Sequence, residues 1–363
     1  MARFRITPWE VTGRIDYGRL IKQFGIRPMD QILLKKLSKY GELHYFFRRG
    51  IVFGHRDLDV LLDELERGGK VYLYTGRKPS GKMHLGHLLP FMLTKHLQDL
   101  FHSPLYVQIT DDEKLLTGAN DGDYVFENLL DIFAVGLDQE KTRIILNTRD
   151  IKVLYGLAIR IAKHVNFSTV KAVFGFKNTS NIGIIFFPAI QAAPCFLGCE
   201  ELGKEYRCLI PASPDQDPYW RGIAREVADA LGYPKPAQIY NKILPGITKD
   251  FKMSSSIPES CIFTTEPRES LTKKVGELFT GGRATIAEQR ERGGNPEVCV
   301  VYEYFTFFEK DEDKVGKIKE DCLSGKLMCG ECKQMLAQVL GDFIEKHMER
   351  REKVRDFVKT IVR

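Results

Sequence analysis

The feature that most constrains the fold is an alternation of short apolar runs with longer amphipathic segments in the middle of the chain. The run KVYLYTG (70–76) is apolar and ends at a glycine, as buried strands do, and the segment after it has apolar residues at helical spacing. The runs PLYVQIT, TRIILNT and YRCLIPA repeat the strand pattern, with helical segments between them. Strands that alternate with helices predict an α/β fold with a doubly wound parallel sheet.

The rest of the chain departs from this alternation in three places. Residues 154–206 predict a helical insertion within a sheet domain of residues 66–262. Residues 1–65 carry mixed helical and turn signals, so we expect a compact N-terminal extension. Residues 263–363 are mostly helical and strongly charged, which predicts a separate all-α C-terminal domain. A chain of 363 residues is long enough for two or three such units.

Composition places the chain among ordinary globular proteins. Hydrophobic residues make up 43% and charged residues 28%, and the net charge of +6 permits a polyanionic partner without requiring one. The N-terminal MARFRITPWEV lacks the apolar core of a signal peptide, and the most apolar run, IGIIFFPAI, is too short to span a bilayer. We expect a soluble cytoplasmic protein without a membrane partner.

The eight cysteines show no disulfide rhythm. Cys329 and Cys332 form a C-x-x-C pair with Cys322 nearby, but no second pair or histidine follows at the spacing of a zinc site. We therefore expect free thiols in a reducing compartment.

The loop TGRKPSGKMHLGH (75–87) follows the first strand and enters a helix. A helix start offers unpaired N–H groups and partial positive charge, which suit a phosphate, and Arg77, Lys78 and Lys82 add full charges. His84 and His87 are expected to share one helix face and to donate hydrogen bonds to phosphate. We do not expect a metal site here, because no third His or Cys follows at a spacing that would place it beside His84 and His87. The motif alone does not separate a phosphate site from an ordinary helix start.

A second motif, KMSSS (252–256), follows where the predicted sheet ends. H-x-G-H followed far downstream by this motif resembles the two signatures of class I aminoacyl-tRNA synthetases. Nearly the whole chain is similar to tryptophanyl-tRNA synthetases of the archaeal and eukaryotic type, through TPWEV, FFRRGIVFGHRD, TDDEK, FPAIQAAP, IPASPDQDPY, GYPKPA, FTGGR and GGN. The resemblance implies a Rossmann-like catalytic domain and a C-terminal domain that reads the anticodon.

The resemblance also implies site residues. Catalytic roles fall on Lys252, His84, His87 and Arg77. The expected ATP-binding residues are Thr75, Gly76, Arg77, Pro79, His84, Gly86, His87, Gln216, Asp217, Lys252, Met253 and Ser254.

For tryptophan, the resemblance implies that Tyr74 and Gln108 supply the acceptor for the indole N–H and that Glu113 holds the ammonium group. A glutamine in the apolar run PLYVQIT already argues against a purely structural role. Gln191 and Gln216 match positions at the polar end of the amino acid. Asp111 and Asp112, which precede Glu113, are expected to cap the following helix instead.

The implied reaction has two steps. The tryptophan carboxylate attacks the α-phosphate of ATP, and pyrophosphate leaves with Mg²⁺ bound. A ribose hydroxyl at the 3′ end of tRNA(Trp) then attacks the activated carbonyl, which releases AMP. Neither step needs a protein nucleophile, so catalysis is positioning and charge stabilisation. The resemblance further implies a homodimer.

The second signature departs from the usual K-M-S-K-S at Ser255. Lys114, Lys249 or Arg77 are candidates for the missing charge, and Lys78 stands where the family often has glycine. A tyrosyl-tRNA synthetase, a small-molecule nucleotidyltransferase and a non-catalytic RNA-binding relative stay open as alternatives.

Overall fold

The structure is a computed structural model that describes residues 15–118, 123–247, 253–255 and 257–362, together with the backbone of two short strands near the N-terminus. Those strands, β1 (Arg5–Ile6) and β2 (Val11–Thr12), pair antiparallel. Lys114 is described, whereas Lys249 and Lys252 lie outside the described residues.

A seven-stranded sheet forms the centre of the described part, in the order β3-β4-β9-β8-β5-β6-β7. The five strands from β9 to β7 are parallel, which confirms the predicted doubly wound sheet. The strands are β3 (Arg27–Pro28), β4 (Val52–Arg56), β5 (Lys70–Arg77), β6 (Leu105–Ile109), β7 (Thr142–Leu146), β8 (Tyr206–Ala212) and β9 (Ala237–Asn241).

The N-terminal segment adds an antiparallel edge to this sheet, which the sequence did not predict. β3 pairs antiparallel with β4, and β4 pairs antiparallel with β9. The helices of this segment are α1 (Tyr17–Phe24), α2 (Gln31–Leu37), α3 (Tyr45–Arg48) and α4 (Leu58–Glu66), with a short turn η1 (Ser38–Tyr40).

Side chains alternate between the two faces of the sheet. On β5, Val71 and Leu73 face one apolar cluster, while Tyr72 and Tyr74 face the other. On the first face lie α5 (Leu85–Phe101), whose Pro90 sits in its first turns, and α7 (Val125–Ala134); α6 (Glu113–Thr117) lies between them in the chain.

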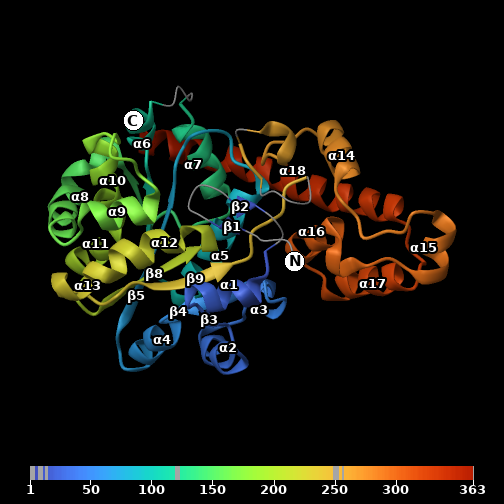
Figure 1. The fold of residues 1–363 in the computed structure, drawn as a ribbon, viewed down its shortest axis with the longest axis horizontal. Helices are drawn as coiled ribbons and strands as arrows, with labels where there is room; N and C mark the ends of the chain where they lie inside the picture. The colour runs from blue at the N-terminus through green and yellow to red at the C-terminus, as the bar shows by residue number, and fades with distance from the viewer. Residues whose placement is uncertain are drawn as a thin grey trace.

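The helical insertion covers the second face, and the first helix on that face begins at Asn147, ahead of the predicted insertion of about 154–206. It occupies one end of the molecule (Figure 1), and its helices are α8 (Asn147–Ala162), α9 (Phe167–Phe174), α10 (Ile182–Ala192) and α11 (Pro194–Glu201). After β8 come η2 (Pro214–Gln216), α12 (Asp217–Tyr219), the π-helical η3 (Trp220–Ala224) and α13 (Arg225–Leu231). Among the described residues no single helix is long and apolar enough to cross a membrane; α10 and α11 reach that length only together, across a 43° bend.

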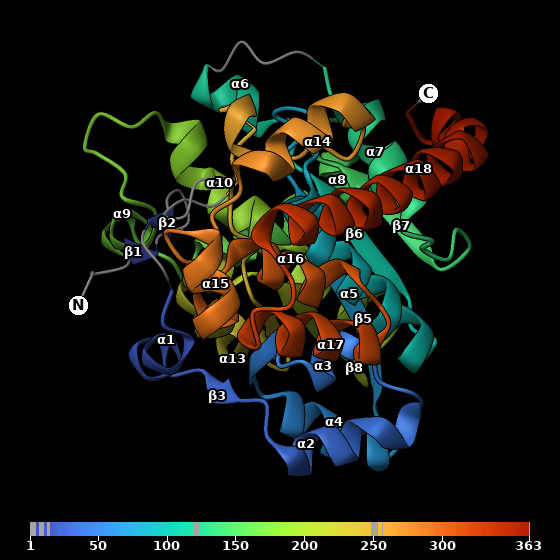
Figure 2. The same ribbon diagram turned by 90° about the vertical axis from the view of Figure 1, so that its right-hand side faces the viewer.

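The C-terminal helices lie at the opposite end, and one of them returns across the molecule (Figures 1 and 2). α18 packs along α7, where His347 Nε2 and an Arg351 nitrogen contact Asp131 Oδ1 at 2.9 and 2.5 Å. One apolar cluster also includes side chains from all three predicted units, for example Leu33, Leu73 and Leu340. The limits of the three domains stay a prediction. The elements are η4 (Pro258–Ser260), α14 (Arg268–Glu277), α15 (Ile286–Arg292), η5 (Pro296–Val298), α16 (Val300–Phe308), α17 (Glu312–Leu323) and α18 (Cys329–Val362).

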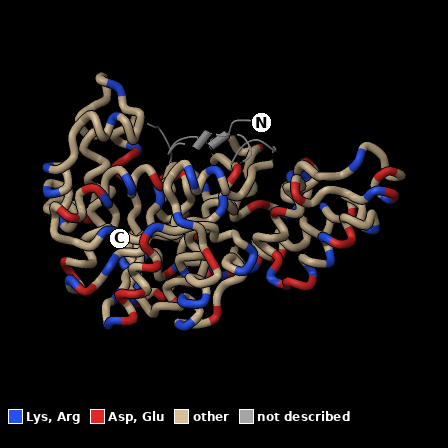
Figure 3. The backbone as a smooth tube through the Cα atoms, turned by 60° about the horizontal axis from the view of Figure 1, so that its bottom comes forward, with Lys and Arg blue, Asp and Glu red and all other residues tan. Residues whose placement is uncertain are grey.

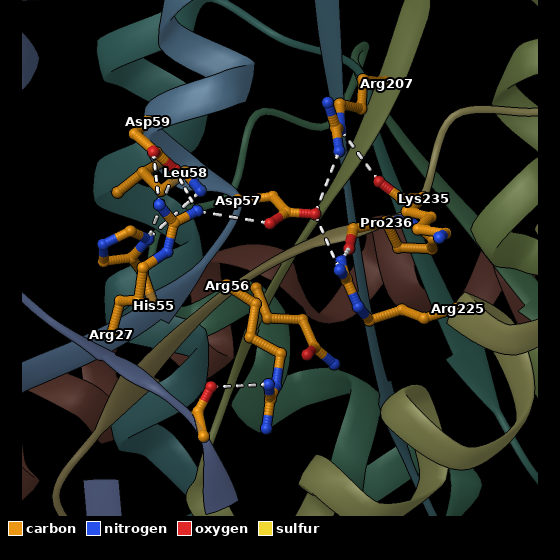
Figure 4. A network of polar contacts seen from close by, with 12 residues as sticks. Arg27, His55, Arg56, Asp57, Leu58, Asp59, Arg207, Arg225, Lys235 and Pro236 are labelled. Atoms are coloured by element: carbon orange, nitrogen blue, oxygen red, sulfur yellow. Dashed lines mark hydrogen bonds and ion pairs between the residues drawn. The ribbon is translucent and has the colours of Figure 1, made fainter. Parts of the chain in front are cut away.

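An ion-pair network fastens the N-terminal segment to the sheet. We call Arg27, Asp57, Arg207 and Arg225 the Asp57 network: Asp57 Oδ2 accepts from Arg225 at 2.7 Å and from Arg207 at 3.4 Å, and Oδ1 accepts from Arg27 at 3.4 Å. Figure 4 shows the arginines reaching Asp57 from both sides. Asp57 has a φ of 53°, in the left-handed region that glycine, asparagine and aspartate adopt more readily than other residues, and the ion pairs hold this turn in place.

Candidate active site

An open cavity of about 1010 Å³ lies at the carboxyl ends of β5, β6 and β8. Parallel strands end at the same edge of a sheet, where open α/β proteins bind their ligands. The start of α5 and residues 253–255 complete its wall. Most of the residues expected from the sequence line it, namely Tyr74, Thr75, Gly76, Arg77, His84, Gly86, His87, Gln108, Glu113, Gln191, Gln216, Met253 and Ser254.

The two signature motifs lie side by side at this cavity. A Cβ built on Gly81 would lie 3.3 Å from the Ser255 Cβ, and Ser255 Oγ donates to the Lys82 carbonyl at 3.1 Å. A Cβ on Gly86 would lie 3.7 Å from Met253 Sδ. Because these contacts join segments far apart in sequence, the pairing of motifs seen in the sequence corresponds to one site.

The two histidines stack on each other rather than standing side by side on a helix face. His84 precedes α5 in an extended conformation, and its ring lies 3.5 Å from that of His87, centroid to centroid. A Cβ on Gly86 would meet the His84 ring at 3.2 Å. The glycine of H-x-G-H is thus needed for the stacked rings themselves, whereas the sequence suggested only the approach of a nucleotide.

Arg77 is a fixed cation at the end of β5. Its Nε donates to Asn128 Oδ1 at 3.0 Å, and one terminal nitrogen lies 3.1 Å from His87 Nε2. Its other terminal nitrogen is buried and has no acceptor among the described residues. Burial lowers the pKa of Arg77 to about 10, which leaves it charged at neutral pH. This is a positive group with room for an anionic ligand.

Tyr74 and Gln108 meet at the floor of the cavity. The Tyr74 hydroxyl donates to Gln108 Oε1 at 2.6 Å, and Gln108 Nε2 donates to Asn147 Oδ1 at 2.8 Å. Both side chains are almost fully buried. The predicted acceptor is therefore already engaged by Tyr74, and Asn147, which orients Gln108, was not expected from the sequence.

Two further polar groups face the cavity without a partner in the described part of the chain. Gln191 Oε1 is a buried acceptor, and Trp220 Nε1 is a buried donor. The Trp220 ring packs edge-on against Tyr74, with centroids 5.4 Å apart. Sequence reasoning missed Trp220; a tryptophan directly after PDQDPY was the only signal for it.

Glu113 is buried at the cavity wall and is paired with Lys78. Their charged atoms are 3.3 Å apart, and Thr110 Oγ1 donates to the other carboxylate oxygen at 3.3 Å. The sequence suggested that Lys78 adds charge near a nucleotide. In the structure its ammonium group pairs with Glu113, the carboxylate expected to hold the ammonium group of tryptophan.

The sequence suggested that Asp111 and Asp112 cap the following helix, but neither side chain does so. Asp111 Oδ1 accepts from the Thr148 backbone N–H at 3.0 Å, and Asp112 Oδ1 accepts from Asn147 Nδ2 at 2.9 Å. They hold the start of α8 instead, because parallel strands β6 and β7 bring the two loops together.

Two residues expected to bind ATP do not line the cavity. Pro79 is buried, whereas its neighbours Lys78 and Ser80 line the cavity. Asp217 is 0% exposed, and its carboxylate accepts from Arg56 Nε at 2.7 Å and from the Tyr240 hydroxyl at 2.5 Å. Asp217 begins α12, and sequence alone does not reveal that its side chain points inward. Lys252 lies outside the described residues, so its place is untested.

Residues 66–345 match the family of class I tRNA synthetases for tryptophan and tyrosine. A protein of Pyrococcus furiosus named tryptophan–tRNA ligase is 49% identical over 98% of this chain and 93% of its own length. A protein of the same name from Pyrobaculum calidifontis is 46% identical over 98% and 96%.

Solved structures agree with these relatives. The structure of a tryptophanyl-tRNA synthetase from Encephalitozoon cuniculi bound to tryptophan superposes with a TM-score of 0.86 at 38% identity, covering 96% of this chain and 97% of that one. The tryptophanyl-tRNA synthetase of Aeropyrum pernix gives a TM-score of 0.86 at 34% identity, covering 95% of each chain.

Proposed function

Because the chain belongs to the tryptophanyl group of the class I tRNA synthetases, we propose that its cavity activates L-tryptophan with ATP and passes it to tRNA(Trp). The observation that supports this most is the meeting of the two signature motifs at one cavity, through Gly81 with Ser255 and Gly86 with Met253. The relatives favour tryptophan over tyrosine as the substrate.

ATP enters along the start of α5 in this proposal. Thr75, Gly76 and Gly86 leave room for the nucleotide, while Arg77, His84 and His87 face the phosphates, and Met253 and Ser254 close from the other side. Lys252 would neutralise the departing pyrophosphate. We propose that Pro79 and Asp217 support the surrounding loops rather than touch ATP, since neither lines the cavity.

Mg²⁺ would enter with the triphosphate. No group of three or more His, Cys, Asp or Glu side chains in the described residues lies close enough to hold a metal ion. This fits Mg²⁺, which is usually held by substrate phosphates and water with few protein ligands.

Tryptophan occupies the floor of the cavity in this proposal. The side chains of Tyr74, Gln108 and Gln191 supply oxygen atoms to the indole N–H and the amino group, and Trp220 offers an aromatic wall. Gln216 also lines the cavity. Glu113 pairs with the substrate ammonium once Lys78 moves to ATP, because both cations compete for one carboxylate.

We expect tRNA(Trp) to bind across the C-terminal domain of a homodimer in the cytoplasm. Lys/Arg and Asp/Glu are interspersed over the chain (Figure 3), so no uniform basic face carries this expectation. Several basic groups of the last helix are engaged within the chain: Arg350 donates to the Ala134 carbonyl at 2.6 Å, and Arg355 and Lys359 pair with Glu352 and Asp356. The expectation therefore rests on the family.

Amino-acid-dependent exchange of pyrophosphate into ATP tests the activation step. We expect exchange with L-tryptophan and none with L-tyrosine, and a sharp loss of exchange in Lys252→Ala. Folded protein that exchanges with neither amino acid, even with tRNA added, would refute the proposal and favour a non-catalytic RNA-binding relative.

A further inference from the structure

A chain of hydrogen bonds leads from outside the cavity to its floor. The Tyr74 hydroxyl donates to Gln108 Oε1 at 2.6 Å, and Gln108 Nε2 donates to Asn147 Oδ1 at 2.8 Å. Asn147 Nδ2 in turn donates to Asp112 Oδ1 at 2.9 Å. Tyr74 and Gln108 line the cavity, whereas Asn147 and Asp112 are not part of its lining. We call these four residues the Gln108 chain.

The direction of the bonds in the Gln108 chain is set at one end. An amide offers an oxygen on one side and an NH₂ group of nearly the same size on the other, so its neighbours decide which way it faces. A carboxylate only accepts, and Asp112 therefore turns the NH₂ group of Asn147 toward itself. Asn147 then presents its oxygen to Gln108, and Gln108 presents its own oxygen beside the Tyr74 hydroxyl. The carboxylate thus decides that an acceptor, rather than a donor, stands at the cavity floor.

The opposite direction fits the same atomic positions. The Gln191 carbonyl lies 2.9 Å from the Tyr74 hydroxyl, so the hydroxyl can donate to that carbonyl and accept from Gln108 instead. The Ile190 carbonyl lies 3.4 Å from Gln108 Nε2, a long distance for a hydrogen bond, and it favours the observed direction weakly. Without the Asp112 carboxylate both directions become accessible, and the Gln108 NH₂ group can take the place of its oxygen.

We propose that Asp112 and Asn147 are positioning residues that make the cavity specific for a ring with an N–H donor. They do so by holding the Gln108 oxygen, and not its NH₂ group, at the cavity floor. A buried acceptor is left unpaired by a ligand that lacks the N–H, so such a ligand is penalised, whereas an NH₂ group in its place would repel the indole N–H. The inference rests on the proposed function of the cavity and deepens it.

The test compares two substrates in the pyrophosphate exchange reaction: L-tryptophan and its benzothiophene analogue, in which a sulfur atom replaces the indole N–H. Burial raises the pKa of Asp112, so exchange is measured at about pH 8, where the carboxyl group is ionised. We expect the wild type to prefer L-tryptophan, in kcat/KM, by about tenfold or more. Asp112→Asn has nearly the same shape and should lower this preference about tenfold. A purely structural role would lower kcat/KM for both substrates by the same factor and leave the preference unchanged.

Asp111→Asn is the matched control. It removes the same charge from the neighbouring residue, whose carboxylate accepts from the Thr148 backbone N–H at 3.0 Å and takes no part in the Gln108 chain. We expect it to keep the preference of the wild type.

A swapped pair provides the rescue. The double variant with Asp112→Asn and Asn147→Asp moves the carboxylate one step along the chain, where it accepts from Gln108 Nε2 directly and again fixes the direction of that amide. We expect the double variant to recover the preference for L-tryptophan that Asp112→Asn loses.

The outcomes separate this inference from the function on which it rests. A wild type that exchanges with neither substrate overturns the proposed function, and this inference with it. A wild type that prefers L-tryptophan, with an equal preference in Asp112→Asn, overturns the inference alone, as does a double variant that recovers nothing. If Asp112→Asn does not fold, Asn147→Leu serves, because it leaves Gln108 free to turn, and an unchanged preference in that variant also overturns the inference.

Discussion

The cavity and the Asp57 network are built from the same kinds of side chain but differ in how completely these are paired. In the Asp57 network three arginines surround one carboxylate. In the cavity Arg77, Gln191 and Trp220 each keep a buried polar atom without a partner among the described residues. Such atoms cost stability, and a protein keeps them where a ligand will pair with them. If the cavity has the proposed function, Arg77, Gln191 and Trp220 keep these atoms for the substrate, whereas the paired charges of the Asp57 network serve the fold.

The largest effect is expected at Arg77. Arg77→Met should reduce tryptophan-dependent pyrophosphate exchange about 100-fold or more, the usual loss when a preorganised donor to a charged transition state is removed. Its free energy of unfolding should stay equal or rise, because a buried and incompletely paired charge is gone. Exchange kinetics and urea unfolding measure the two quantities. Near-normal exchange would show that the unpaired group of Arg77 does not serve the reaction.

Asp57→Asn should do the reverse. Asparagine tolerates the positive φ but removes the carboxylate that pairs with Arg225, whereas Arg27 keeps Asp59 and Arg207 keeps Glu64. The free energy of unfolding should therefore fall by about 1–3 kcal/mol. Exchange per folded molecule should not change, since Asp57 is not part of the cavity lining. An unfolding curve equal to that of the wild type would mean that the network contributes nothing.

The pH dependence of stability sharpens the same point. Burial raises the pKa of Asp57, but Arg225, Arg207 and Arg27 together lower it by more. The pKa of Asp57 therefore lies below the usual value for an aspartate. A depressed carboxyl pKa gives stability that is present above the unfolded-state value of about 3.9 and is lost as the pH falls through the folded-state value. The stability gap between wild type and Asp57→Asn should therefore shrink below about pH 4. A gap that stays constant down to acid unfolding would contradict this.

Tyr74→Phe tests the floor of the cavity. Without the hydroxyl, Gln108 Oε1 loses its donor, and a buried unpaired acceptor costs about 1–3 kcal/mol. The KM for L-tryptophan should rise about tenfold, because the variant lacks the Tyr74 oxygen that we propose contacts the substrate and because Gln108 is no longer held by the hydroxyl. Tyr72→Phe is the matched control, because the Tyr72 hydroxyl is equally buried but bonds the Pro194 carbonyl at 3.2 Å. An equal rise in KM for both variants would remove the special role of Tyr74.

The smallest effect is expected at Lys78. Its pair with Glu113 is partly exposed, so Lys78→Ala should change binding by no more than about 1 kcal/mol. The KM for L-tryptophan should fall a few-fold, because the Glu113 carboxylate is freed, while the KM for ATP should rise. Lys78→Arg retains the charge and should behave like the wild type. A higher KM for tryptophan in Lys78→Ala would show that the lysine does not compete with the substrate.

Sequence predicted what depends on local patterning. The strand at Tyr206–Ala212 and the helix after H-x-G-H follow from apolar spacing, and both are present. β3 was missed because it is only two residues long and pairs with β4 alone. β4 was missed because it joins the sheet by pairing with β9, a contact between distant segments that no local pattern encodes.

The site was predicted through resemblance, and its finer points needed the fold. Asp217 points into the protein because Arg56, from a strand far away in sequence, holds it. Asn147 holds Gln108 and Trp220 lines the cavity, and both come from other elements, so their neighbours along the chain gave no sign of these roles. The stacking of His84 on His87 likewise depends on how the chain enters α5.

The most direct test of the comparison is to measure exchange activity and unfolding together for Arg77→Met and Asp57→Asn. The two sites are predicted to separate: Arg77→Met loses activity at full stability, and Asp57→Asn loses stability at full activity per folded molecule. If both variants lost activity and stability in the same proportion, the division between paired structural charges and unpaired functional groups would be wrong.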